Sequence, residues 1–224
     1  NMYQSNYEKA LNYLFRSLEI AKTLSNNNLL ARTYNNIGLV YDNMTDYSKA
    51  ITWYFKSLQQ FEAAGDKNGV AMANNNIGGI YFNQENYIKA LENFKTALDF
   101  SLEVNNTKGI GNAYNNIGTV YNQLGDHKEA IRNFFGALAA RKQEENLRGM
   151  ADTYHNIAMV FFSQRNYDKA LENYNASLEI EERLNNKPGL AVSYNSIAEV
   201  LLLQKKYKDA RSYLEKAYKL AEEI

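Results

Sequence analysis

The chain has 224 residues, with 25 basic and 25 acidic side chains and no cysteine. Balanced charge argues against general nucleic-acid binding, which needs a basic stripe, and against electrostatic capture by anionic membranes. The lack of cysteine excludes disulfides, thiolate catalysis and cysteine zinc sites, and no apolar run reaches the roughly 18 residues that would span a bilayer.

The first predicted element is a helix over residues 1–24. A second helix is predicted over roughly 29–43, where Ile37, Val40 and Tyr41 recur at helical spacing, and a third over roughly 47–64. Together the second and third form a hairpin. The same hairpin pattern then continues along the rest of the chain.

The hairpin pattern is a repeat with a period of 40 residues. Segment 34–41, Tyr-Asn-Asn-Ile-Gly-Leu-Val-Tyr, recurs in varied form at 74–81, 114–121, 154–161 and 194–201. An aromatic residue or histidine followed three residues later by alanine keeps the same period, from Tyr7 and Ala10 to Tyr207 and Ala210. The predicted boundaries are a partial repeat at 1–30, full repeats at about 31–70, 71–110, 111–150 and 151–190, and a truncated repeat at 191–224.

Two kinds of break separate the helices. The breaks within repeats contain residues suited to N-capping the second helix: Asp46, Asn86, Asp126 and Asn166. The breaks between repeats are polar, as at 65–68, and are expected to be longer; a glycine follows them at 69, 109, 149 and 189. Ordering a residue costs roughly 1–2 kcal/mol of backbone entropy, so each hairpin is expected to depend on its neighbours for burial.

The motif residues resemble tetratricopeptide repeats over the whole chain. In one repeat the family pattern is matched by Tyr114, Ile117-Gly118, Tyr121, Ala130, Phe134 and Ala137. The family's usual proline after the second helix is absent, and this 40-residue variety is similar to repeats of kinesin light chain and of bacterial sensor and regulator proteins. The resemblance implies an all-α fold, a right-handed α-solenoid of antiparallel helix hairpins that forms a single domain over residues 1–224.

Small residues recur in the first helix of each repeat, where they are expected to allow close approach of the paired helix. They are Gly38, Gly78, Gly118, Ala158 and Ala198.

Asparagine recurs in the middle of the first helices, where it is a poor helix former. The resemblance implies that these helices line a concave groove. By similarity to the repeats of O-GlcNAc transferase, the asparagine at 36 and its equivalents would form a ladder that bonds the backbone of an extended peptide, since a primary amide offers donors and an acceptor. The alternative is that these asparagines bond neighbouring backbone and fix helix stacking.

The predicted peptide-binding groove combines these asparagines with variable positions on the same helices. Three of the variable residues are apolar and could anchor a partner, although phenylalanines there could instead pack between repeats. The groove residues are Asn35, Asn36, Asn75, Asn76, Asn115, Asn116, His155, Asn156, Asn195, Arg32, Phe82, Phe162 and Leu202.

No motif for catalysis is present, and we predict a protein that is not an enzyme and has no cofactor. His127 and His155 have no acidic partner at metal-ligand spacing, so no metal site is expected. Arg32 alone does not form the basic cluster with which related domains clamp chaperone tails.

The predicted function is a scaffold that binds a protein or an extended peptide, as the adaptor or sensory part of a larger bacterial signalling protein. The sequence begins inside a repeat and ends without a polar capping helix, which favours a neighbouring segment. The alternatives are a structural module that self-associates end to end as a homo-oligomer, and a receptor for a short signalling peptide. We expect a cytoplasmic location, or a periplasmic one if an upstream signal segment has been removed.

Overall fold

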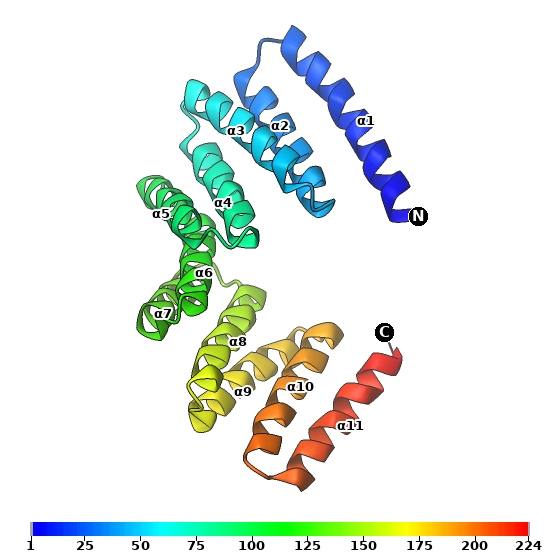
Figure 1. The fold of residues 1–224 in the computed structure, drawn as a ribbon, viewed down its shortest axis with the longest axis vertical. Helices are drawn as coiled ribbons and strands as arrows, with labels where there is room; N and C mark the ends of the chain where they lie inside the picture. Colours follow the sequence, from blue (N-terminus) through cyan, green and yellow to red (C-terminus); the bar gives the residue numbers. More distant parts are fainter. Residues whose placement is uncertain (1, 224) are drawn as a thin grey trace. The chain divides into compact units, whose positions relative to one another are not determined.

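The computed structural model describes residues 2–223, with side chains from residue 6 onward, and this part of the chain folds into eleven α-helices without a strand (Figure 1). The predicted all-α class is confirmed. The helices are α1 (Met2–Thr23), α2 (Asn27–Asn43), α3 (Tyr47–Ala64), α4 (Lys67–Asn83), α5 (Tyr87–Glu103), α6 (Thr107–Gln123), α7 (His127–Gln143), α8 (Leu147–Ser163), α9 (Tyr167–Arg183), α10 (Lys187–Leu203) and α11 (Tyr207–Glu223).

The turns between helices are all short, which corrects the prediction of a longer break between repeats. A residue with left-handed backbone conformation recurs every 20 positions, from Ser25 to Lys205, so turns within and between repeats are alike. Glycine takes this position only at Gly65 and Gly125. The first helices begin about two residues earlier than predicted, because the polar residues of each break form the first helical turn.

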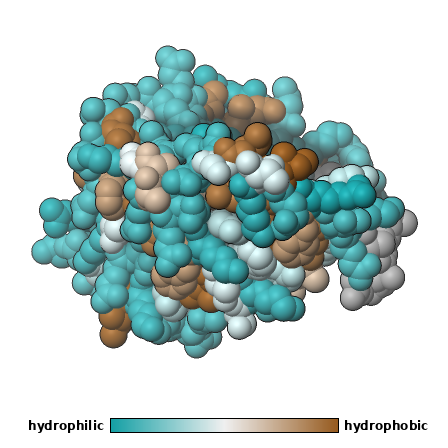
Figure 2. All heavy atoms as spheres, turned by 90° about the horizontal axis from the view of Figure 1, so that it is seen from above, coloured by the Kyte–Doolittle hydropathy of each residue, from teal (hydrophilic) through white to brown (hydrophobic). Residues whose placement is uncertain are grey.

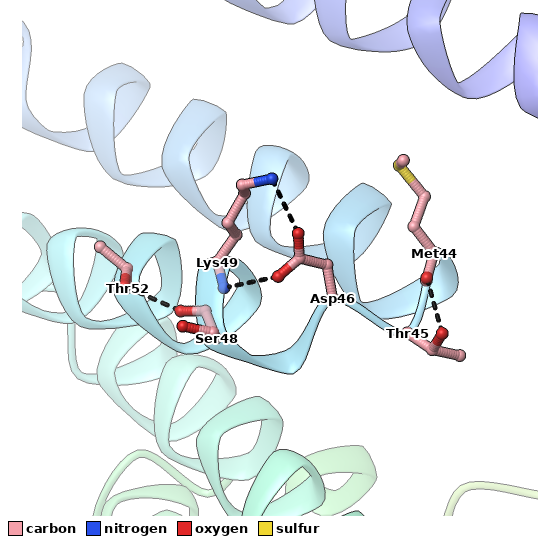
Figure 3. A network of polar contacts seen from close by, with 6 residues as sticks. All are labelled: Met44, Thr45, Asp46, Ser48, Lys49 and Thr52. Carbon is pink, nitrogen blue, oxygen red and sulfur yellow. Dashed lines mark hydrogen bonds and ion pairs between the residues drawn. The ribbon is translucent and has the colours of Figure 1, made fainter.

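The predicted N-caps of the second helices are confirmed. Asp46 Oδ1 accepts a hydrogen bond from the Lys49 backbone N–H at 3.2 Å, and its Oδ2 lies 2.8 Å from Lys49 Nζ (Figure 3). These hydrogen bonds from Lys49 hold the pKa of Asp46 below its usual value. Asn86, Asp126 and Asn166 accept equivalent backbone bonds at 3.1–3.3 Å.

The first helices are capped in the same way, which the sequence did not predict because these residues were assigned only to the polar breaks between repeats. The side chains of Asn26, Asp66, Asn106 and Asn146 each accept from the backbone N–H three residues later, at 2.9–3.0 Å. Such a bond satisfies one of the donors left open at a helix start. A capping residue therefore recurs every 20 residues, and it starts a first helix and a second helix in turn.

Lys206 breaks this capping pattern at the start of α11. The nine earlier turns all carry asparagine or aspartate at this position, whereas a lysine side chain has no acceptor. We expect Lys206→Asn to raise the free energy of unfolding by about 1 kcal/mol, measured by urea denaturation. Lys208→Asn, inside the first turn of α11, is the control and should give no gain; equal effects of the two substitutions would contradict the capping account.

The helix contacts divide the chain into two compact units, residues 1–116 and 117–224. In the first compact unit, Tyr54 of α3 packs with Ile77 and Ile80 of α4, which belongs to the next hairpin. In the second, Tyr174 of α9 packs with Ile197 of α10. Hairpins thus complete each other's cores within each unit, as the repeat pattern predicts.

The predicted close approach of paired helices is confirmed at the glycines. A Cβ atom added to Gly38 or Gly78 would lie 2.7 Å from the ring of Tyr54 or Phe94. The equivalent distance from Gly118 to Phe134 is 2.8 Å. On the face shown in Figure 2, hydrophobic residues form separate patches among hydrophilic ones.

Candidate binding groove

A hollow of about 700 Å³ lies in the first compact unit. Its walls come from the first helices of three hairpins, α2, α4 and α6, and its base comes from the second helices α3 and α5. It brings together five predicted groove residues, Arg32, Asn35, Asn36, Asn75 and Asn76. Met72 and Asn112 line it as well.

The asparagines of neighbouring first helices bond to each other. Asn76 Nδ2 on α4 donates to Asn35 Oδ1 on α2 at 2.8 Å, and Asn116 Nδ2 on α6 donates to Asn75 Oδ1 on α4 at 2.8 Å. The alternative prediction was that these asparagines bond to neighbouring backbone. In the structure their partners are instead the side-chain amides of neighbouring asparagines. Each bond links successive first helices, 41 residues apart.

These amide pairs keep unused hydrogen-bonding groups. Within the described residues, Asn35 Nδ2 donates no hydrogen bond and Asn76 Oδ1 accepts none. Neither of these two atoms is fully buried, so both can reach solvent or a ligand. In the same way, Asn75 Nδ2 donates no hydrogen bond and Asn116 Oδ1 accepts none within the described residues, and neither atom is fully buried. Each step along the first helices therefore offers one donor and one acceptor, which is what a peptide unit requires.

A second hollow, of about 400 Å³, lies in the second compact unit. It contains the predicted residues His155 and Asn156 of α8 and also residues of α9 and α10. The His155 ring packs against the Tyr174 ring at a tilt of 57°, with centroids 5.1 Å apart. Burial lowers the pKa of His155, against a weaker opposing effect of Asp152, so the ring is neutral near neutral pH.

The neutral state of His155 predicts a pH dependence. The pKa of His155 is lower in the folded chain than in the unfolded chain, where it is about 6.5. The contribution of neutral His155 to folding stability is therefore complete above about pH 6.5. The contribution is lost as the pH falls through the folded pKa. We expect the melting temperature to fall more steeply between about pH 7 and pH 5 in the natural chain than in His155→Asn, which carries the residue of the equivalent positions 75 and 115. Parallel pH profiles would refute this role.

The remaining predicted groove residues lie outside the two hollows. The rings of Phe82 and Phe162 pack at a tilt against Tyr87 and Tyr167, with centroids 5.7 and 6.1 Å apart, so each contacts the second helix of its own hairpin. Phe162 also packs against the core cluster that includes Ile197 and Val200 of the next hairpin. Asn195 and Leu202 are exposed on α10, and Asn115 lies beside Asn116 on α6. Their part in binding stays a prediction.

Sequence reasoning missed the buried position at the base of the hollows. It occurs once per repeat near the end of each second helix, beside the first-turn glycine of the next helix. The side chain at this position is apolar, polar, basic and acidic in successive repeats: Phe61, Ser101, Arg141 and Glu181, all at most 7% exposed. The periodic glycines at 69, 109, 149 and 189 were the signal for it, because each is in contact with this side chain.

Arg141 fills this position by bonding to α8. Its guanidinium donates to the Gly149 carbonyl and to Thr153 Oγ1. Burial lowers the pKa of Arg141, and Asp152 and Glu144 oppose that shift. The side chain thus connects two helices of the second compact unit.

Within the described part of the chain, no three histidine, aspartate or glutamate side chains gather as metal ligands. In the same residues, no helix combines the length and apolar character needed to cross a bilayer.

Serial helix hairpins whose first helices line polar hollows define the class of helical repeat scaffolds. The chain matches the tetratricopeptide repeat family over residues 1–63, 69–143 and 149–223. It belongs to this family, and membership supports a protein–protein interaction scaffold, a class that is typically non-enzymatic. A comparison with curated proteins finds no match.

Solved structures with the same fold include BtubC (BKLC) from P. vanneervenii, with a TM-score of 0.86 and 18% identity, covering 96% of this chain and 91% of that one. A Rap protein complexed with competence and sporulation factor gives a TM-score of 0.74 at 18% identity, over 87% of this chain and 55% of that one. MamA gives 0.58 at 24% identity, over 86% and 92%. At these identities the similarity shows the fold alone, and this chain spans about half the length of the Rap protein.

Proposed function

We propose that the protein is a scaffold without catalytic activity that binds a partner protein through an extended segment of peptide, held in the hollow of the first compact unit. The observation that carries this proposal is the pair of amide bonds, Asn76 to Asn35 and Asn116 to Asn75. They fix the orientation of the amides and leave a donor and an acceptor at each step. Peptide recognition through the main chain uses this kind of regular pairing.

The proposed biological setting is the adaptor or sensory part of a larger signalling protein in a bacterium. Family membership supports the adaptor role, because hairpin repeats present an extended binding surface. The signalling role has weaker support, from the Rap fold similarity and from the variable residues Arg32, Met72 and Asn112 that line the hollow.

A receptor for a short signalling peptide is the second candidate. The first hollow, at about 700 Å³, has the size of pockets that bind small ligands, roughly 300–1,000 Å³. A structurally similar Rap protein was crystallised with competence and sporulation factor. The length of peptide needed for full affinity separates the two candidates.

The test is to select ligands for the full chain from a displayed library of random peptides and to measure their affinity by calorimetry. Asn76→Ala combined with Asn116→Ala should weaken binding at least about tenfold, since each lost hydrogen bond is worth roughly 0.5–1.5 kcal/mol. Asn93→Ala combined with Asn173→Ala is the control, because these amides bond only to their own second helices. Equal affinities for both double variants would remove the asparagine groove.

A further inference from the structure

The hollow of the second compact unit corresponds to part of the hollow in the first. Its lining positions match by a shift of two repeats, so that Glu181 takes the place of Ser101, 80 positions earlier. Helices α8, α9 and α10 take the places of α4, α5 and α6. Because the helical framework is the same, the side chains decide how the two hollows differ in what they bind.

Those side chains make the second hollow anionic. Among the lining residues, Asp152 replaces Met72, Glu181 replaces Ser101, and the exposed Arg148 carries the one positive charge. Arg141, whose charge interacts with Asp152, is not part of the lining. Two negative charges against one positive charge give a net charge of −1. His155 adds none, because it is held neutral by burial.

Glu181 is the unusual member of this hollow, because its carboxylate is buried without a cation. The side chain is 4% exposed, and its Oε2 accepts a hydrogen bond from Asn186 Nδ2 at 2.7 Å. Within residues 6–223 no other donor bonds this carboxylate and no ion pair includes it. The other carboxylate oxygen, Oε1, is not fully buried. Because Glu181 lines the hollow, we take Oε1 to be accessible from it.

The surroundings of Glu181 are altered to hold it. Asn186 makes no capping bond to the backbone of α10, unlike the asparagines and aspartate that cap the first helices before it, and its amide turns to Glu181 instead. The carboxylate lies against Gly189 in the first turn of α10, where the helix dipole favours negative charge. The dipole offsets only part of the cost of a buried charge, and an opposite charge with matching hydrogen bonds offsets much more.

We propose that this second hollow binds a basic side chain of the partner, arginine or lysine, with Glu181 at its base and Asp152 in its wall as the anionic groups. This inference rests on the proposed function, because the arginine or lysine side chain would belong to the bound peptide. A guanidinium has planar donors that match a carboxylate in pairs. The hollow, at about 400 Å³, has room for such a side chain.

The test titrates N-acetyl-arginine methylamide into the full chain and follows backbone amide signals by nuclear magnetic resonance. We expect saturable shifts at Gly189 and Ser193, and binding of the uncharged citrulline analogue at least about tenfold weaker. Glu181→Gln should weaken the arginine probe at least about tenfold and Asp152→Asn several-fold. Glu179→Gln removes the same charge from the exposed face of α9 and should leave binding unchanged.

Three results would overturn the proposal: equal binding of the citrulline analogue, unchanged binding by Glu181→Gln, or no shift at these amides. Stronger binding by alanine methylamide, whose only cation is its α-ammonium, would overturn it in favour of a peptide N-terminus. Circular dichroism checks the fold of Glu181→Gln. If Glu181→Gln does not fold, the effect of Asp152→Asn on binding of the arginine probe decides whether the proposal stands. The Asn76 and Asn116 substitutions should not change this titration, so failure here is separate from failure of the asparagine groove.

Discussion

Phe134→Ala is expected to lower the free energy of unfolding by about 3–5 kcal/mol, the usual cost of removing a buried aromatic side chain. Phe134 is 1% exposed and packs with Ile157 and Val160 of the next hairpin, so its removal leaves a cavity between two repeats. Urea denaturation followed by circular dichroism measures the change.

The adjacent residue provides the control for this prediction. Phe135 follows on the same helix but is 54% exposed, so Phe135→Ala should change the free energy of unfolding by no more than about 0.5 kcal/mol. A similar loss from both substitutions would show that stability does not come from packing between hairpins.

A second adjacent pair tests the close approach of paired helices. Gly78→Leu is expected to destabilise the chain by about 1–3 kcal/mol or to prevent folding, because its Cβ would lie 2.7 Å from the Phe94 ring. Gly79→Leu meets nothing within 4 Å. It should raise stability by roughly 0.5–1 kcal/mol, since leucine favours the helix more than glycine.

Thermal denaturation of the two leucine variants gives the comparison. Leu39 already occupies the position equivalent to Gly79 and is 46% exposed, so the second variant copies a neighbouring repeat. Stabilisation by both substitutions would mean that the paired helices are not as close as the structure places them.

The periodic part of the fold was accessible from the sequence. The spacing of Ile37, Val40 and Tyr41 predicted a helix, and Asp46 marked the start of the next, because both signals act within one turn of chain. The turns between repeats were predicted too long, since Lys67 and Asn68 resemble loop residues by composition. Their helical state follows from the cap at Asp66, one residue earlier.

The candidate site was only partly accessible. Asn35, Asn75 and Asn76 lie together because a 40-residue period places equal positions side by side, and this the sequence predicts. The burial of Glu181 was not predicted, since a glutamate near a helix end is usually solvated. Its depth depends on contact with Gly189 of the following helix, which only the packed structure shows.

The most direct test of the asparagine groove is the side-chain amide signals of the asparagines, followed by nuclear magnetic resonance during titration with a library-selected peptide. The account predicts that the amide signals of Asn35, Asn75 and Asn76 move together and saturate. The amides of Asn93 and Asn133, which bond to their own second helices, should stay in place. Shifts confined to Asn93 and Asn133, with the other three unmoved, would contradict it.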